Sequence, residues 1–222
     1  YSLDKDGLIF AGGDFDINQY SKFIPDNNNI IPVLNSDTRY FEDDVMVRFE
    51  EFLKVAFSEG YLGENIDFIA KAIGKKANES SRETIRKYFA NEFFTDHCKM
   101  YKKRPIYWQF TSGKSKAFSC LVYQHRIDKN LLSKMRIDYV QPLQNKLEIE
   151  QKDLIDILES DATTKDKRDA KNKLKLVEKQ IDELKVFHEK LRHMADKQIE
   201  IDLDDGVVYN HSLFGDLVVK IK

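Results

Sequence analysis

Hydrophobic positions recur at helical spacing from Phe41 to Phe94. In FEDDVMVRFEEFLKVAFS (41–58) apolar residues recur three or four apart, which predicts a helix with one apolar face and acids in its first turn. GENIDFIAKAIG (63–74) predicts a second helix that ends at Gly74, a residue suited to a C-terminal cap. SSRETIRKYFANEFF (80–94) predicts a third helix, capped by Ser80 or Ser81.

Aromatic and β-branched residues predict strands in the middle of the chain and near its start. RPIYWQF (104–110) and AFSCLVYQ (117–124) are joined by the glycine-containing TSGKSK, which predicts a hairpin. The short apolar runs GLIFAGG (7–13) and NIIPVL (29–34) predict further strands. We expect the hairpin to bury four of its apolar side chains: Trp108, Phe110, Phe118 and Leu121.

After Asp128 the pattern is again helical for about seventy residues. Pro142 should start or kink a helix, and DATTKDKR (161–168) predicts a polar turn. Apolar residues then recur at alternating spacings of three and four, with His188 in the intervening slot: Leu174, Val177, Ile181, Leu184, Leu191 and Ala195. Two such segments joined by a short turn predict an antiparallel helical hairpin. The tail, 199–222, predicts strand, turn and strand.

These elements together predict an α+β fold that is mainly helical. It would comprise a helical cluster, a small antiparallel sheet and a long two-helix, coiled-coil-like hairpin. We expect four segments along the chain: an irregular region over 1–40, the helical cluster with the β-hairpin over 41–128, the helical hairpin over 129–199, and a C-terminal β segment over 200–222.

Composition and charge narrow the class of protein. The 222 residues carry a formal net charge of −2, yet residues 52–199 hold a surplus of eight basic residues. Two cysteines are too few for a disulfide framework and favour a reducing cytoplasm. The sequence shows neither a signal peptide nor an apolar run of membrane-spanning length. Because it opens at YSLDKDG without Met, we expect it to be part of a longer protein.

One stretch, KMYKKRPIYWQFTSGKSKAF (99–118), combines basic and aromatic residues. It lies within a window free of acids, between Asp96 and Asp128. Clustered lysines and arginines suit phosphate contacts, and aromatic rings can stack on bases where strands are opened. Alternatively, the aromatics fill a core and the loop lysines are only solvated. If the hairpin closes, we expect the cations that flank the two strands to meet: Lys102, Lys103, Arg104, Lys114 and Lys116. These five are the candidate DNA-binding residues, with Arg126 as a weaker member.

Other binding motifs fit the sequence less well. The segment 66–93 resembles a helix-turn-helix, but its connection of about seven residues exceeds the usual three or four, which favours a packed helical pair. His97, Cys98, Cys120 and His125 lack the paired spacing of a zinc site, so buried structural cysteines are the better interpretation. DKDG (4–7) and DLDDG (202–206) begin like calcium loops without the glutamate at position twelve, and we interpret them as turns.

Catalytic motifs are absent from the sequence. It contains no Gly-x-Ser-x-Gly, His-Glu-x-x-His or phosphate-binding loop, and no carboxylates visibly paired for acid–base work. We therefore assign no catalytic, metal-binding or cofactor-binding residue to this chain.

Several long stretches closely resemble the C-terminal part of PglX-type adenine-specific DNA methyltransferases of BREX phage-defence systems. These enzymes are in turn similar to large type II restriction–modification enzymes. The stretches span 42–57, 65–74, 85–126, 135–144 and 190–210, and the resemblance as a whole runs from about Tyr40 to Asp216. Its most specific block is KRPIYWQF…SGK (103–114). Residues 1–39 match less well and would correspond to the end of a preceding target-recognition region.

The resemblance implies that the chain is part of a DNA-modification enzyme. It also implies that the catalytic residues of that enzyme lie outside this chain. Such methyltransferases hold the flipped adenine with an Asn-Pro-Pro-Tyr motif and bind S-adenosylmethionine through a glycine-bearing motif, and this chain contains neither. The implied partners are double-stranded DNA, an upstream methyltransferase domain and other defence-complex subunits. The helical hairpin also resembles the spacer helices of type I specificity subunits. Three functions thus stay open: a DNA-holding lobe, a protein-interaction module that docks another subunit, or a purely structural helical brace for the upstream domain.

Overall fold

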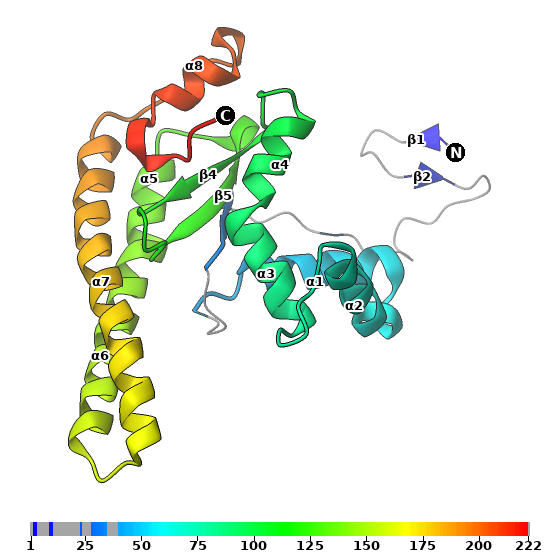
Figure 1. Cartoon of the computed structure of the whole chain (residues 1–222). Coiled ribbons are helices and arrows are strands. Elements are labelled where there is room, and N and C mark those ends of the chain that lie inside the picture. Colours follow the sequence, from blue (N-terminus) through cyan, green and yellow to red (C-terminus); the bar gives the residue numbers. More distant parts are fainter. Residues whose placement is uncertain (1, 4–8, 11–22, 24–27, 35–39, 222) are drawn as a thin grey trace.

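A three-stranded antiparallel sheet forms the middle layer of the fold, with helices on both of its faces (Figure 1). The computed structural model describes residues 2–3, 9–10, 23, 28–34 and 40–221. The strand order is β3–β5–β4, so β5 is hydrogen-bonded on both sides. The strands are β3 (Ile30–Pro32), β4 (Tyr107–Thr111) and β5 (Ser119–Tyr123), with β1 (Ser2–Leu3) and β2 (Ile9–Phe10) as a separate pair. The predicted class, α+β and mainly helical, is confirmed.

Alternation along the strands divides the interior into two cores. Trp108, Phe110 and Cys120 point into the larger core, against the helices of the second half of the chain. Leu121, on the other face of β5, points into the smaller core among the first helices. All four side chains expected in the core, including Phe118, are at most 4% exposed. The hairpin is therefore confirmed, and both faces of its sheet are covered.

Four helices cover the smaller core, and polar side chains cap the start of two of them. The Asp44 carboxylate accepts a hydrogen bond from the Met46 amide and starts α1, while Ser80 and Glu83 form a reciprocal capping box at the start of α3. The third predicted helix is in fact two, because the backbone bends at Glu92. These helices are α1 (Val45–Phe57), α2 (Leu62–Ala72), α3 (Ser81–Asn91) and α4 (Phe93–Met100), with a 3-10 turn at Glu59–Tyr61.

A continuous helical segment on the other side of the sheet passes through a π-helical stretch. It comprises α5 (Leu131–Lys134), the π-helical Met135–Val140 and α6 (Gln141–Glu159). Pro142 lies in the first turn of α6, where its missing N–H and its ring disturb the preceding hydrogen bonds. The predicted start or kink at Pro142 is therefore confirmed as a change of helix type.

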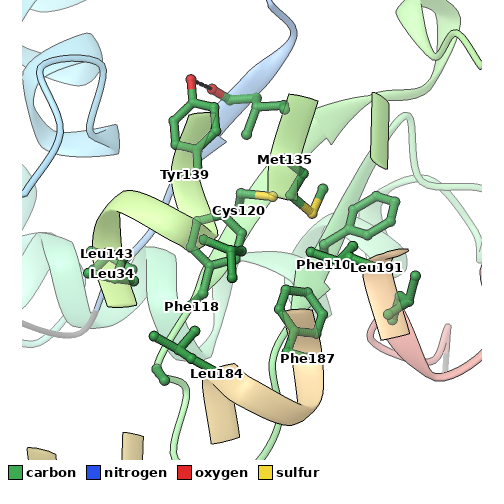
Figure 2. Packing of buried hydrophobic residues seen from close by; sticks show 14 of the residues in the cluster. Leu34, Phe110, Phe118, Cys120, Met135, Tyr139, Leu143, Leu184, Phe187 and Leu191 are labelled. Carbon is green, nitrogen blue, oxygen red and sulfur yellow. Dashed lines mark hydrogen bonds between the residues drawn. The ribbon is translucent and has the colours of Figure 1, made fainter. Parts of the chain in front are cut away.

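The antiparallel helical hairpin forms as predicted, between α6 and α7 (Thr164–Ala195), and extends beyond the sheet (Figure 1). Thr163 caps α7, so that helix begins inside the predicted polar turn. Val177, Ile181, Leu184 and Leu191 are buried as expected, but Phe187 takes the intervening core position and His188 is only half-buried. The reason is that this end of α7 lies beside α5 and the π-helical segment, where Phe187 enters the larger core and contacts Phe118, which directly precedes β5 (Figure 2).

The predicted strand-turn-strand of the tail is wrong. The tail forms α8 (Val207–Ser212) between 3-10 turns at Leu203–Asp205 and Gly215–Leu217. Aromatic burial overrides the local β-propensity, because Phe214 packs edge-on against Trp108 and Phe110. A β-bridge from Phe110 to Val218 adds to the edge of β4. In the described part of the chain, no helix combines the length and apolarity needed to cross a membrane.

The loop between β4 and β5 is held by a carboxylate from α7. Glu183 accepts hydrogen bonds from the Ser112 hydroxyl (2.6 Å), the Ser115 amide (2.7 Å) and the Ala117 amide (3.1 Å). A Cβ on Gly113 would lie 2.8 Å from this carboxylate, so the close approach requires glycine. Burial by itself would raise the pKa of Glu183, but the hydrogen bonds outweigh burial and the pKa is lowered.

We expect Glu183→Gln to destabilise the fold by about 1–2 kcal/mol, because the amide NH₂ faces groups that are themselves donors. The carboxylate's contribution should be full above its unfolded pKa of about 4.3 and vanish as pH falls through the lowered folded pKa. Urea unfolding of both proteins between pH 3 and 7 measures this. The difference between the two stabilities should be largest at pH 7 and shrink as pH falls below about 4.3; a constant difference across this range would contradict the role of the charge.

Candidate nucleic-acid interface

Two of the predicted cations lie in a strained turn at the end of α4. The Lys103 amide donates to the Cys98 carbonyl (2.8 Å) and the Lys102 amide to the Lys99 carbonyl (3.1 Å), the pattern of a Schellman cap. Lys102 and Lys103 both have positive φ, 49° and 64°. Glycine is the usual residue in this conformation, and other residues lose roughly 1–2 kcal/mol there. Two consecutive lysines therefore occupy positions at which glycine would be more favourable for stability.

The residues that follow the strained turn are hydrogen-bonded to a buried side chain of α4. His97 Nε2 accepts hydrogen bonds from the Ile106 and Tyr107 amides at 3.2 and 3.0 Å, which holds the start of β4 against α4. The Trp108 indole donates to the Pro105 carbonyl at 3.0 Å. Burial lowers the pKa of His97, consistent with a neutral imidazole that accepts at Nε2. The turn is thus an ordered part of the fold.

The strand register separates the predicted cations into two groups. Tyr107 pairs with Tyr123 at one end of the hairpin, and Thr111 pairs with Ser119 at the other. Residues 102–104 precede β4 and Arg126 follows β5, so Lys102, Lys103, Arg104 and Arg126 lie at the same end, which we call the basic end of the sheet. Lys114 and Lys116 lie in the loop at the opposite end, about 14 Å away along the strands. This register corrects the expectation that Lys102, Lys103 and Arg104 would meet Lys114 and Lys116.

The two loop lysines differ from one another. Lys114 is exposed in the segment that Glu183 holds. Lys116 is half-buried, and its ammonium donates to the Ala90 carbonyl and the Asn91 side chain at the C-terminal end of α3. Burial lowers the pKa of Lys116. The Lys116 ammonium is therefore already hydrogen-bonded to the C-terminal end of α3, where positive charge is favourable.

The aromatic side chains at the basic end were not predicted as site residues, because the hairpin aromatics were assigned to the core. Tyr107 and Tyr123 lie at the strand ends with their rings 5.4 Å apart, and His125 lies 5.1 Å from Tyr123. Tyr101 is 39% exposed and packs 4.6 Å from His97. Position within the strand could have separated these rings from the core aromatics. Tyr107 and Tyr123 lie at the terminal positions of their strands, whereas Trp108 and Phe110 lie inside β4.

The other candidate motifs are accounted for by packing. The connection between α2 and α3 covers residues 73–80, and α3 buries Ser81, Thr84, Ile85 and Ala90 among its neighbours, so the packed helical pair is the better interpretation. The described residues contain no cluster of metal-ligating side chains, and Cys98 and Cys120 are buried cysteines that form no disulfide with each other. The carboxylate of Asp202 accepts from the Asp204 amide, as in a turn. The DKDG turn lies outside the described residues.

Comparison with known proteins identifies the relatives of this fold. The chain is 44% identical over 215 residues to the adenine-specific methyltransferase PglX of Lacticaseibacillus casei (strain Zhang) and 43% identical over 234 residues to the adenine-specific methyltransferase BrxX of Escherichia coli O9:H4 (strain HS). These matches include 96% and 100% of the chain, but only 18% and 19% of the relatives. No family model matches the chain.

The chain is therefore homologous to part of a class of large adenine-specific methyltransferases. Specifically, it corresponds to the C-terminal region of the PglX and BrxX proteins, as the sequence resemblance predicted. It spans about a fifth of their length.

We expect Lys102→Gly to leave stability unchanged or to raise it by up to about 1 kcal/mol, because glycine relieves the positive-φ backbone. Lys102→Val should lower stability, since a β-branched residue suits this backbone less well. Thermal unfolding of the two variants beside the parent chain measures the effect. A clear loss of stability in Lys102→Gly would mean that the lysine side chain itself stabilises the turn.

Proposed function

We propose that this chain is the DNA-recognition and DNA-holding region of an adenine N6-specific DNA methyltransferase of a BREX-type phage-defence system, without catalytic activity of its own. The homology to PglX and BrxX supports the parent enzyme. Transfer of the methyl group, with S-adenosylmethionine as the donor, belongs in this proposal to a domain upstream. Double-stranded DNA and that domain are the proposed partners, and the cytoplasm is the proposed location.

The observation that carries the proposal is the ordered basic end. Lys102, Lys103 and Arg104 are exposed, and their backbone is fixed by the cap of α4 and by His97. Cations on a rigid frame lose little conformational freedom when they meet phosphates. Two lysines at positive φ further suggest that charge is required there, since strained residues concentrate at functional sites. Arg126 adds a fourth positive charge at the same end.

The loop cations provide a second point of contact for the proposed DNA binding. Lys114 is exposed about 14 Å from the basic end, far enough to reach a different phosphate of the same duplex. Lys116 would be a lesser contact, because its ammonium is bound to the end of α3. Contacts of this kind supply affinity and position the protein without reading sequence. Most of the proposed target-recognition segment, 1–40, lies outside the described residues.

The α6–α7 hairpin supports a second candidate function, docking of another subunit of a defence complex. Large apolar side chains are exposed on both of its helices: Ile149, Ile155, Ile157, Leu176 and Val186 are 37–59% exposed. Exposed apolar side chains gathered on one element are suited to protein contacts. This candidate predicts binding that depends little on salt, which separates it from phosphate contact.

Duplex binding across a salt series tests the main proposal. Log affinity of the 222-residue chain for a short duplex should fall steeply with log salt, because each phosphate contact releases counterions. The double variant Lys102→Glu/Lys103→Glu should bind more weakly and reduce the slope by about one per lysine. The measurement is fluorescence anisotropy between 50 and 300 mM salt.

A matched charge reversal at two exposed lysines on α7, Lys171→Glu/Lys175→Glu, is the control, because it changes the net charge equally and lies away from the basic end. It should leave the slope almost unchanged. Equal effects of the two double variants would mean that DNA binding depends on net charge alone and not on the basic end. Absence of duplex binding by the parent chain would overturn the proposal and favour the docking function.

A further inference from the structure

A connected series of aromatic rings leads from the interior to the basic end. Phe93 stacks on His97 with centroids 5.4 Å apart and an interplanar angle of 13°, and His97 contacts Tyr101 at 4.6 Å and Tyr107 at 5.8 Å. Tyr107 then contacts Tyr123 at 5.4 Å. The rings thus come from α4, β4 and β5, elements that are fixed to one another by His97 and by strand pairing.

These rings reach the surface among the cations. Tyr101 directly precedes Lys102 and is 39% exposed, His125 is exposed beside Arg126, and Tyr107 and Tyr123 are half-buried between them. Burial raises the pKa of the Tyr107 phenol; nearby Tyr123 and Tyr101 add to the rise, and Arg126 opposes it. Tyr101 and Arg126 are therefore both near enough to the Tyr107 phenol to influence its pKa, although they come from opposite flanks of the hairpin. The phenol of Tyr107 stays neutral at physiological pH.

Exposed rings among phosphate-binding cations have a particular chemistry. A groove for single-stranded nucleic acid combines cations that follow the backbone with aromatic faces on which bases stack. An intact duplex keeps its bases paired inside, so it would meet the cations but leave the rings unused. Lysines on a rigid turn next to exposed tyrosines therefore suit a strand whose bases are unpaired better than they suit a closed duplex.

We propose that the basic end binds an unpaired stretch of DNA, with the phosphates on Lys102, Lys103, Arg104 and Arg126 and an unstacked base on Tyr101. This deepens the proposed DNA-holding function and rests on it. Enzymes that modify a base extrude it from the helix and leave its surroundings locally unpaired. The basic end would hold such an opened strand, and the exposed ring of Tyr101 is the point of base contact.

The test compares three oligonucleotides of the same length: a duplex, the same duplex with a short central bubble, and the single strand. Each carries 2-aminopurine, whose fluorescence reports stacking, at an unpaired or corresponding position. The 222-residue chain should bind the bubble and the single strand more tightly than the closed duplex and quench the probe. Tyr101→Leu should lose about tenfold in affinity for the bubble, together with the quenching, and keep its affinity for the closed duplex.

Two further variants separate stacking from general damage. Tyr101→Phe keeps the ring and should restore bubble binding and quenching. Tyr61→Leu removes a tyrosine that is 59% exposed in the turn between α1 and α2, and should behave like the parent chain. Thermal unfolding confirms that each variant is folded.

The outcomes distinguish the two proposals. If duplex binding is salt-dependent but the bubble binds no better, or if Tyr101→Leu leaves bubble binding and quenching intact, the stacking proposal fails while the DNA-holding function stands. If the parent chain binds none of the three oligonucleotides, both fail. Preference for the bubble with loss in Tyr101→Leu and rescue in Tyr101→Phe supports both.

Discussion

Burial of both faces of a small sheet is the constraint on which the rest of the structure depends. Three short strands provide little stability of their own, so helices must cover each face and supply the two cores. Once both faces are covered, only the strand ends and the connecting turns remain open to solvent. Charged and half-buried aromatic residues therefore gather at those ends, and any ligand of the hairpin has to be met there.

Polar clamps make the open ends rigid. His97 holds the start of β4, and Glu183 of α7 holds the loop between β4 and β5. On the α1–α4 side, the Arg86 guanidinium forms two 2.8 Å hydrogen bonds with the buried carboxylate of Asp44, the same group that caps α1. The Glu183 and Arg86 clamps join elements that are distant in the sequence, whereas His97 joins the consecutive elements α4 and β4. Each clamp also satisfies a polar group that would be costly to bury alone.

Prediction from the sequence succeeded where periodicity and local capping decide the structure. The helices α1, α2 and α7, the hairpin and the core position of Trp108 follow from spacing that is visible in the chain. It failed where distant contacts override local preference. The tail became α8 because Phe214 packs on Trp108, and Phe187 took the core position expected of His188 because it contacts Phe118 in the larger core. Of the candidate site, the cations were predicted, but their division between two ends and the neighbouring tyrosines were not.

By itself, the sequence determined which residues form helices and strands, which side chains are apolar enough for the core, and that one acid-free stretch concentrates positive charge. Hydrophobic spacing and caps act over a few residues, so a linear pattern contains them. Tertiary structure alone decided which cations share an end of the sheet, that Lys116 is occupied by the end of α3, and that Tyr101 and Tyr123 accompany the basic turn. Those relations depend on strand register and on packing between distant segments, which a one-residue slip would change without altering the hydrophobic content of the chain.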